Sequence, residues 1–506
     1  MRFPSIAACA LALARSIPVA LAASCPDGLC LKTRAALSSF QVASELGPLL
    51  SKGALIFGPE DPRWANATER YQTYLPPNIR IVVEPAVEAD VPIIVKYANR
   101  HSLPFLAVNR AHGYTITLNK FDGLQINMAQ LRNITISNDR ESALMQGGVY
   151  GAQVIQALWD QGYVTSTGSC GCVGILGPGL GGGHGRYQGM YGLVSDAFIK
   201  LNVVLADGSA VTVSDKSHQD LFWAMRGAGH NFGIVTSFET KIWPKNLDTW
   251  YYRNLIFTQD KLEALFTELN KLGGNGTQPK ELGHYGMYLK AAGIADPVIW
   301  WSFSYTGSQE DAEPYLQPFN DLGYISYDDG NVPYPDIAPA MQTGIDDPLC
   351  EPGLERISAT AGLQVFNLTT QRQIYELYEK NINQYPELVN SWVVMEQYSV
   401  EGVRAVDPAS QAYPMRDDYL LMAIDVDYTT NHSLDAIAFE WVHETRDLWN
   451  AGQPERKPTA YVNYAMGDEP IEQWYGWEPW RLAKLRALKR QYDPHGRFNY
   501  YNPITY

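Results

Sequence analysis

The chain contains 506 residues, of which 46% are hydrophobic and 18% are charged. This balance is typical of a globular protein and excludes a disordered or membrane-embedded chain, and the length predicts two domains. The formal net charge of −15 disfavours nucleic acid and anionic membrane surfaces as partners. We therefore expect a small-molecule substrate.

Residues 1–23 have the pattern of a secretory signal peptide. A basic Arg2 precedes an apolar run over residues 6–13, and the small residues Ala22 and Ala23 stand at the expected cleavage point, although Arg15 interrupts the apolar region. A membrane anchor is the alternative, but the apolar run is too short to favour it. We thus expect a mature chain that is secreted or held in the lumen of the secretory pathway.

Potential N-glycosylation sites agree with this route. Asn-X-Ser/Thr triplets occur at five positions, Asn66, Asn133, Asn275, Asn367 and Asn431. One such triplet arises easily by chance, but five in a chain with a signal peptide are typical of a secreted glycoprotein.

The mature chain would keep an odd number of cysteines, namely Cys25, Cys30, Cys170, Cys172 and Cys350. In an oxidising compartment one thiol therefore needs another use, and a covalent bond to a cofactor is such a use. Cys25 and Cys30 could close a small loop, but the sequence does not establish this pairing.

The first elements after the signal peptide predict a βαβ-like unit. Residues 81–83 are a β-branched run, residues 87–100 have the apolar spacing of a helix, and residues 104–108 form a short apolar strand. This pattern places His112 in a loop at the tip of the unit. Another helix and strand are expected over residues 152–162.

A glycine-rich segment follows over residues 168–192. Its glycine density excludes a regular helix or strand and suggests backbone lying close to a ligand. It matches neither the GxGxxG turn of a Rossmann fold nor the GxxxxGK[ST] loop of a nucleotide triphosphatase. A structural hinge is the alternative interpretation.

The rest of the chain predicts two further regions. Residues 198–214 are expected to form a hairpin that turns at Asp207 and Gly208, before a helix, a glycine turn and a strand up to residue 244. Longer helices near residues 259–272 and 371–385 and aromatic strands at 298–305 and 391–398 then predict a mixed α and antiparallel β domain over 246–455.

The motifs AVNRAHGYT, TGSCGCVGILGPGLGGGHG, DLFWAMRGAGHNFGIVTSF, AYVNYAMGDE and KRQYDPHGRFNYYNPI occur in this order over residues 107–504. Together they resemble the berberine bridge enzyme-like branch of the vanillyl alcohol oxidase superfamily, in its fungal FAD-linked form. The resemblance implies an α+β fold with a PCMH-type FAD-binding domain of two subdomains at residues 24–245. A C-terminal segment, residues 456–506, would complete this domain, and residues 246–455 would form the substrate domain.

The same resemblance implies FAD held by two covalent bonds, from His112 and Cys170. Cys172 remains an alternative to Cys170, and Arg110 and Ala111 stand where many relatives carry a glycine pair. Attachment at two points would fix the ring and raise its redox potential.

Other FAD contacts follow from the matching motifs. Two backbone segments are expected to cradle the pyrophosphate, with Gly174 close by. The first comprises Asn109, Arg110, Ala111, His112 and Gly113, and the second runs from Gly179 to Gly183 and includes Gly181 and Gly182. The resemblance places Ile234 beside the adenine or ribitol end and Asn463 at the isoalloxazine edge. Strand packing for Ile234 and a turn cap for Asn463 are the alternatives.

The resemblance also implies that Val173, three residues after Cys170, lies where dioxygen approaches the flavin. A small side chain there goes with oxidase behaviour. Packing under the flavin is the alternative role for this valine.

Tyr464 is our first candidate for the general base, because relatives use a tyrosine of this segment and a strongly hydrogen-bonded site could lower its pKa. Tyr461 and Tyr114 are expected beside it, and Glu396 and Glu401 are rival bases. The nine histidines show no metal-ligand spacing, so a catalytic metal is not expected.

These patterns predict a monomeric oxidase that passes hydride from a small organic substrate to FAD and then to O2 in secondary metabolism. A carbohydrate oxidase is the first alternative, for which Trp300, Trp301 and Trp392 would suit sugar stacking, although these side chains would suit a hydrophobic metabolite equally well. A flavin-fold protein without turnover is the second.

Overall fold

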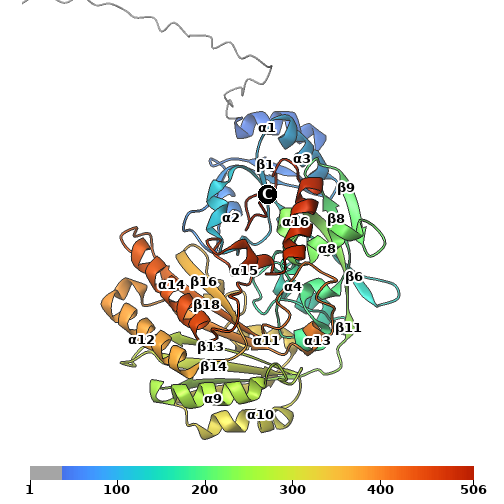
Figure 1. Cartoon of the computed structure of the whole chain (residues 1–506). Helices are drawn as coiled ribbons and strands as arrows, with labels where there is room; N and C mark the ends of the chain where they lie inside the picture. The colour runs from blue at the N-terminus through green and yellow to red at the C-terminus, as the bar shows by residue number, and fades with distance from the viewer. Residues whose placement is uncertain (1–36, 506) are drawn as a thin grey trace, which may run out of the picture. The chain divides into compact units, whose positions relative to one another are not determined.

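The computed structural model describes residues 37–505 (Figure 1). The predicted signal peptide and the Cys25–Cys30 pair lie outside the described residues. Within the described part, no helix is long and apolar enough to cross a membrane.

The first sheet carries the loop of His112. Its strands, in order across the sheet, are β1 (Leu55–Phe57), β2 (Asn78–Glu84), β4 (Asp122–Asn127) and β3 (Phe105–Val108). Helix α3 (Asp90–Arg100) joins β2 to β3 and buries Val91, Ile94, Val95 and Ala98 at helical spacing. The predicted strand, helix and strand therefore form, but the two strands lie on either side of β4, and both run parallel to it.

The second sheet is antiparallel. Its strands, in order across the sheet, are β5 (Ile134–Ile136), β6 (Ser142–Gln146), β10 (Ile234–Lys241), β8 (Phe198–Val204) and β9 (Ala210–Ser214). Strands β8 and β9 form the predicted hairpin, and Gly208 takes a φ of +82° in its turn, which glycine adopts at no steric cost. Helices α4 (Gly151–Trp159) and α8 (Gln219–Ala228) share a core with this sheet, and β7 (Tyr163–Val164) pairs with β11 (Trp243–Pro244).

The largest sheet has seven strands in antiparallel order. These are β15 (Ser326–Val332), β12 (Trp250–Phe257), β14 (Val298–Tyr305), β13 (Leu282–Leu289), β17 (Trp392–Tyr398), β18 (Leu420–Tyr428) and β16 (Glu355–Leu363). One face packs on α9 (Leu262–Gly273), α10 (Gln309–Asp321), α12 (Leu368–Gln384) and α14 (Asp435–Ala451), which lie along the sheet in Figure 1. In β17 the two-residue period sends Val393 and Met395 to this core and Val394 and Glu396 to the opposite face.

The C-terminal segment returns to the second sheet. Residues Ala460, Val462, Leu485 and Ile504 are buried in one core with residues of β8, β10 and α8. Helices α15 (Ile471–Tyr475) and α16 (Pro479–Tyr492) belong to this segment, and α16 packs against α8. The chain thus places residues after 456 beside residues that precede 245.

The glycine-rich segment contains short helices, so the exclusion of a helix from its glycine density is wrong. They are α5 (Leu176–Leu180), α6 (Gln188–Tyr191) and α7 (Val194–Ala197). In α5, Pro178 lies in the first turn, where a backbone N–H has no partner within the helix, so proline costs no hydrogen bond. The remaining helices are α1 (Ser39–Leu46), α2 (Trp64–Thr68), α11 (Tyr334–Ala340) and α13 (Glu401–Arg404).

Candidate active site

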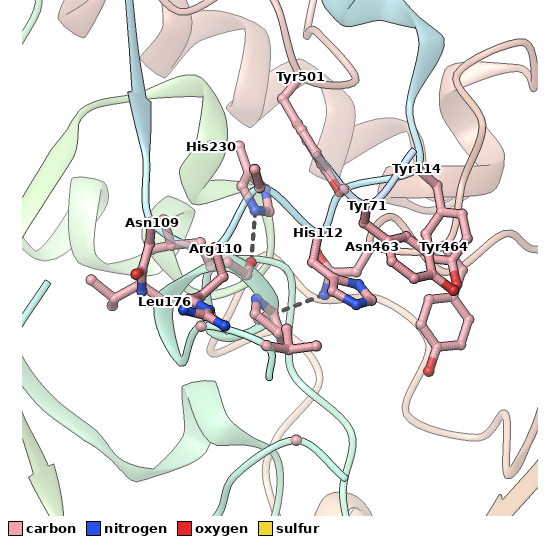
Figure 2. A pocket seen from close by; sticks show the side chains of 18 of the residues that line it. Tyr71, Asn109, Arg110, His112, Tyr114, Leu176, His230, Asn463, Tyr464 and Tyr501 are labelled. Carbon is pink, nitrogen blue, oxygen red and sulfur yellow. Dashed lines mark hydrogen bonds between the residues drawn. The ribbon is translucent and has the colours of Figure 1, made fainter. Parts of the chain in front are cut away.

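A cavity of about 340 Å³ is enclosed by loops of the first two sheets, by β13, β17 and β18 of the largest sheet, and by the C-terminal segment. Among the predicted site residues, its lining includes Asn109, Arg110, Ala111, His112, Gly113, Tyr114, Cys170, Val173, Gly174, Ile234, Tyr461, Asn463 and Tyr464. Figure 2 shows the rings of Tyr71, His112, Tyr114 and Tyr464 on one side of this cavity and Asn109, Arg110 and Leu176 on the other. Residues more than 350 positions apart in sequence therefore meet in one site.

The loop after β3 presents unused backbone donors to the cavity. Within the described residues, the amides of Arg110 to Gly113 donate to no protein acceptor, although they line the cavity. The Arg110 side chain donates to the carbonyl of Cys172 at 2.9 Å, and Ala111 holds a left-handed φ of +51°. Successive free amides in a tight loop form an anion-binding concavity. This geometry suits a pyrophosphate.

The run from Gly179 to Gly183 does not belong to this cradle, which corrects the sequence-based expectation. Its glycine amides donate to protein acceptors at Ile175, Pro178, Gly179 and Tyr461, and Gly179, Gly181, Gly182 and Gly183 are absent from the cavity lining. A Cβ on Gly179 would lie 2.7 Å from the Phe198 ring, and one on Gly182 would lie 2.7 Å from Tyr413. These glycines are required by close packing of the protein on itself.

His112 is held between aromatic and basic groups. Its ring stacks on Tyr71 with a centroid distance of 3.8 Å, and the Arg356 guanidinium lies 3.8 Å from the centroid of the same tyrosine. Burial, and then the positive charges of Arg356 and Arg110, lower the pKa of His112 to about 3. The imidazole is therefore neutral at physiological pH and keeps a nitrogen lone pair.

The two neighbouring cysteines have different chemistry. Cys172 forms a disulfide with Cys350, whereas Cys170 carries the free thiol and faces the cavity. Cys172 Sγ lies 3.6 Å from His112 Nε2, so the disulfide lies beside the histidine loop. Burial and the nearby Glu396 raise the pKa of Cys170 to about 12, and Arg186 acts in the opposite direction. Of the two candidates for a bond to a cofactor, Cys170 is the one with a thiol available.

Several acceptors at the cavity wall have no protein partner among the described residues. Asn109 Oδ1, Asn463 Oδ1 and His230 Nδ1 are all buried without a hydrogen bond, although Asn463 Nδ2 donates to the Pro178 carbonyl at 3.0 Å. Buried polar groups are rarely left unpaired in native proteins. Together with the free amides of Arg110 to Gly113, these atoms fit a large polar cofactor such as FAD.

A buried carboxylate connects the loops to the largest sheet. Glu396 Oε1 accepts a hydrogen bond from the Tyr464 hydroxyl at 2.5 Å, and Oε2 accepts one from the Tyr398 hydroxyl at 2.7 Å. The Tyr398 oxygen also lies 2.6 Å from Ser169 Oγ, next to Cys170 in the chain. Burial raises the pKa of Glu396, and the tyrosine hydrogen bonds oppose this shift.

Tyr464 differs from its expected ionisation. Burial, and then the Glu396 charge, hold its pKa well above the ordinary range, so the predicted lowering of this pKa is wrong. The Tyr464 hydroxyl is therefore a hydrogen-bond donor to the buried Glu396 carboxylate in this structure. Tyr461 is anchored elsewhere, because its hydroxyl accepts from the amide of Gly183 at 3.2 Å and from Asn463 at 2.7 Å.

Some predicted residues lie away from the cavity. Glu401 is exposed at the start of α13, and of the three tryptophans only Trp392 contributes to the lining. Trp301 faces the helix-covered core and Trp300 packs against Tyr285. Glu401 is therefore not placed to act as a base in this cavity, and Trp300 and Trp301 are not placed to stack on a sugar there.

No sequence motif pointed to the charged residues around Tyr71, on which the His112 ring stacks. Asp425 is fully buried, and burial and then the charge of Asp427 raise its pKa well above the ordinary range, whereas Arg356 and Tyr114 act in the opposite direction. Asp427 lies 3.4 Å from Arg356, which contacts the Tyr71 ring under His112. These residues come from β16, β18 and the segment before β2, so no local pattern joins them.

Comparison with known proteins agrees with this site. Residues 79–214 match the family described as FAD binding domain. The chain is 59% identical over 498 residues to the FAD-linked oxidoreductase anuG of Penicillium roqueforti, covering 98% of each chain. The chain belongs to the FAD-linked oxidoreductases.

Solved structures with the same fold have lower sequence identity to this chain. A carbohydrate oxidase from Microdochium nivale, solved with a substrate analogue, has a TM-score of 0.78 at 21% identity and covers 92% of this chain and 99% of its own. Glucooligosaccharide oxidase from Acremonium strictum, which carries a 6-S-cysteinyl, 8α-N1-histidyl FAD, has a TM-score of 0.77 at 20% identity and covers 92% of this chain and 98% of its own. These likenesses confirm the predicted PCMH-type α+β fold of this FAD-linked oxidoreductase.

Proposed function

We propose that this FAD-linked oxidoreductase is an oxidase that takes hydride from a small, largely apolar organic alcohol or related substrate and passes the electrons to O2 in secondary metabolism. The observation that carries the proposal is the Tyr464–Glu396 hydrogen bond, which lies in the same cavity as His112 and Cys170. A proton acceptor and the two nucleophiles thus face one space. When bound, FAD supplies a two-electron acceptor for the substrate hydride.

FAD would be held by His112 and Cys170, with free amides of the loop after β3 at its pyrophosphate. The support for His112 is its neutral imidazole, which keeps the lone pair needed to form a bond. The support for Cys170 is its free thiol at the cavity, because Cys172 is consumed by a disulfide. Asn463 Oδ1 is free to accept from the flavin edge, and Ile234 also lines the cavity.

Proton removal would run through two side chains. The Tyr464 oxygen accepts the substrate proton while its own hydroxyl proton moves to Glu396 Oε1, to which it is already hydrogen-bonded. Tyr464 need not ionise by itself, which its raised pKa would oppose. The second hydrogen bond, from Tyr398 to Oε2, holds the carboxylate in place.

The substrate side of the cavity favours an apolar molecule. Its polar atoms already have partners: the Tyr285 hydroxyl donates to the Met341 carbonyl, Trp392 Nε1 donates to Asp427 at 3.1 Å, and Thr343 Oγ1 donates to the Ala338 carbonyl. Apolar Val394, Ala423 and Leu349 fill the rest of this wall. An oligosaccharide would bury hydroxyls that this wall does not satisfy, and each unpaired group costs about 1–3 kcal/mol.

A carbohydrate oxidase is the second candidate, because the solved structures with the same fold include chitooligosaccharide oxidase and the carbohydrate oxidase from Microdochium nivale. Purified protein should be mixed anaerobically with a panel of aromatic, allylic and aliphatic alcohols and with oligosaccharides, while flavin absorbance is followed. We expect bleaching with apolar alcohols. Bleaching with oligosaccharides alone would reverse the assignment, and bleaching with neither under any condition would favour a flavin-fold protein without turnover.

Oxidase behaviour is supported by Val173, which lines the cavity three residues after Cys170 and is small enough to leave room for O2.

A secreted, N-glycosylated monomer is our proposal for the mature form. Its support is the Cys172–Cys350 disulfide, typical of an oxidising compartment, and the exposure of all five predicted acceptor asparagines. Mass spectrometry of protein from a fungal host, before and after glycosidase treatment, tests the glycans.

A further inference from the structure

Three ionisable side chains meet at the edge of the largest sheet, away from the cavity. Glu355 is the first residue of β16 and pairs in register with Tyr428, the last residue of β18. The loop after β18 contains His432 and ends at Asp435, which begins α14. Strand pairing therefore places Glu355 beside this loop. One ligand atom from each of Glu355, His432 and Asp435 lies within 4.8 Å of the other two.

Glu355 is the unusual member of this group. Its residue is 6% exposed, and Oε2 is buried without a hydrogen-bond partner among the described residues. No salt bridge to a lysine or arginine is formed in the described part of the chain either. Buried carboxylates are normally paired or bound to a metal. The described residues therefore provide no cation to pair with the Glu355 carboxylate, and a bound metal ion could supply one.

The other two side chains are arranged as ligands. His432 Nδ1 lies 3.3 Å from Asp435 Oδ2, and two atoms that bind one zinc ion tetrahedrally at about 2.0–2.1 Å are separated by about 3.3 Å. Asp435 Oδ1 accepts a hydrogen bond from the Tyr428 hydroxyl at 2.8 Å, which orients the carboxylate so that Oδ2, the hydrogen-bond partner of His432 Nδ1, faces the histidine. His432 is exposed, so a water molecule can reach the fourth position.

We propose that Glu355, His432 and Asp435 form a structural site for a divalent transition metal of the zinc class. Two carboxylates and one neutral imidazole are a donor set that zinc accepts, whereas magnesium and calcium prefer oxygen ligands alone. The ion would neutralise the buried Glu355 and join the start of β16 to the loop between β18 and α14. The site is independent of the proposed oxidase reaction.

The test uses the flavin-loaded, untagged full-length protein. After removal of bound metal with a chelator and dialysis, zinc chloride is added, and binding is followed by calorimetry, metal content and melting temperature. We expect one zinc ion per chain, a rise in melting temperature and unchanged flavin absorbance. The variants Glu355→Gln and His432→Ala should both lose this ion and the temperature rise.

His443→Ala is the matched control, because His443 is a partly exposed histidine of α14 that pairs with Asp468 at 2.6 Å outside the proposed site. It should bind zinc as the wild type does. His432→Ala removes only an exposed side chain, so we expect this variant to fold. It therefore still tests the proposal if Glu355→Gln does not fold. Equal zinc binding by wild type and His432→Ala, or no binding by wild type, would overturn the proposal.

Discussion

The two walls of the cavity differ in what their polar groups already bind. The group that we call the loop wall comprises residues 109–113 and Cys170, and it leaves the backbone amides of Arg110 to Gly113, the Cys170 thiol and the side-chain oxygen Asn109 Oδ1 without partners among the described residues. The group that we call the sheet wall comprises Glu396 and Tyr398 of β17 and Tyr464 of the C-terminal segment, and its hydroxyls are bonded because Glu396 accepts hydrogen bonds from both tyrosines. Unused groups indicate a wall built to bind a ligand, whereas a satisfied network around one carboxylate indicates a wall built to move a proton. Variants of the two walls should therefore have separate effects.

The largest effect is expected from substitutions in the loop wall, on the covalent attachment of the flavin. The double variant His112→Ala, Cys170→Ala should release all of its flavin on acid precipitation, because no side chain remains to form a covalent bond. Each single variant should keep one bond and retain the flavin with a shifted absorption spectrum. The measurement is flavin absorbance in the pellet and the supernatant. Wild-type protein that gives up all its flavin to acid would contradict the two-bond assignment.

A change on the sheet wall should leave attachment intact. Tyr464→Phe removes the hydroxyl that links the substrate to Glu396, so anaerobic flavin reduction should slow by roughly 10²-fold or more. Tyr461→Phe is the comparison, since the Tyr461 hydroxyl is bonded to the Gly183 amide and to Asn463. Equal reduction rates in wild type and Tyr464→Phe would transfer the role to another group.

A smaller effect is expected from a change at Val173, on the rate at which O2 reoxidises the reduced flavin. Val173→Ile adds one methylene where the cavity is lined closely, and should slow reoxidation of the reduced protein by O2 about tenfold, or about 1.4 kcal/mol in barrier. Reduction by substrate should hardly change. Stopped-flow reoxidation measures this. If both rates were unaffected, Val173 would have no part in oxygen access.

Much of the fold followed from sequence patterns that act locally. The helical spacing of Val91, Ile94 and Val95 and the hairpin turn at Gly208 are set by neighbouring residues, and both formed as expected. The position of β4 between β2 and β3 was not predictable, because it depends on pairing between strands far apart in the chain.

The site was predictable only where motifs carried it. The motifs located His112, Cys170 and Tyr464 on one cavity, but glycine density at residues 179–183 was misread, since close packing and ligand approach both require a missing Cβ. Whether Cys170 or Cys172 is free depended on Cys350, which lies 178 residues from Cys172. The Tyr71–Arg356 support of His112 is likewise long-range.

The most direct test of the account is the pH dependence of anaerobic flavin reduction in wild type and Glu396→Gln. Burial raises the pKa of Glu396, and the carboxylate accepts a proton only when ionised. In wild type the rate should therefore fall about tenfold per pH unit below that pKa and level off above it. Glu396→Gln should be slower by roughly 10²-fold or more at high pH and lose this dependence while keeping its flavin. A variant with the wild-type rate and pH profile would contradict the central claim.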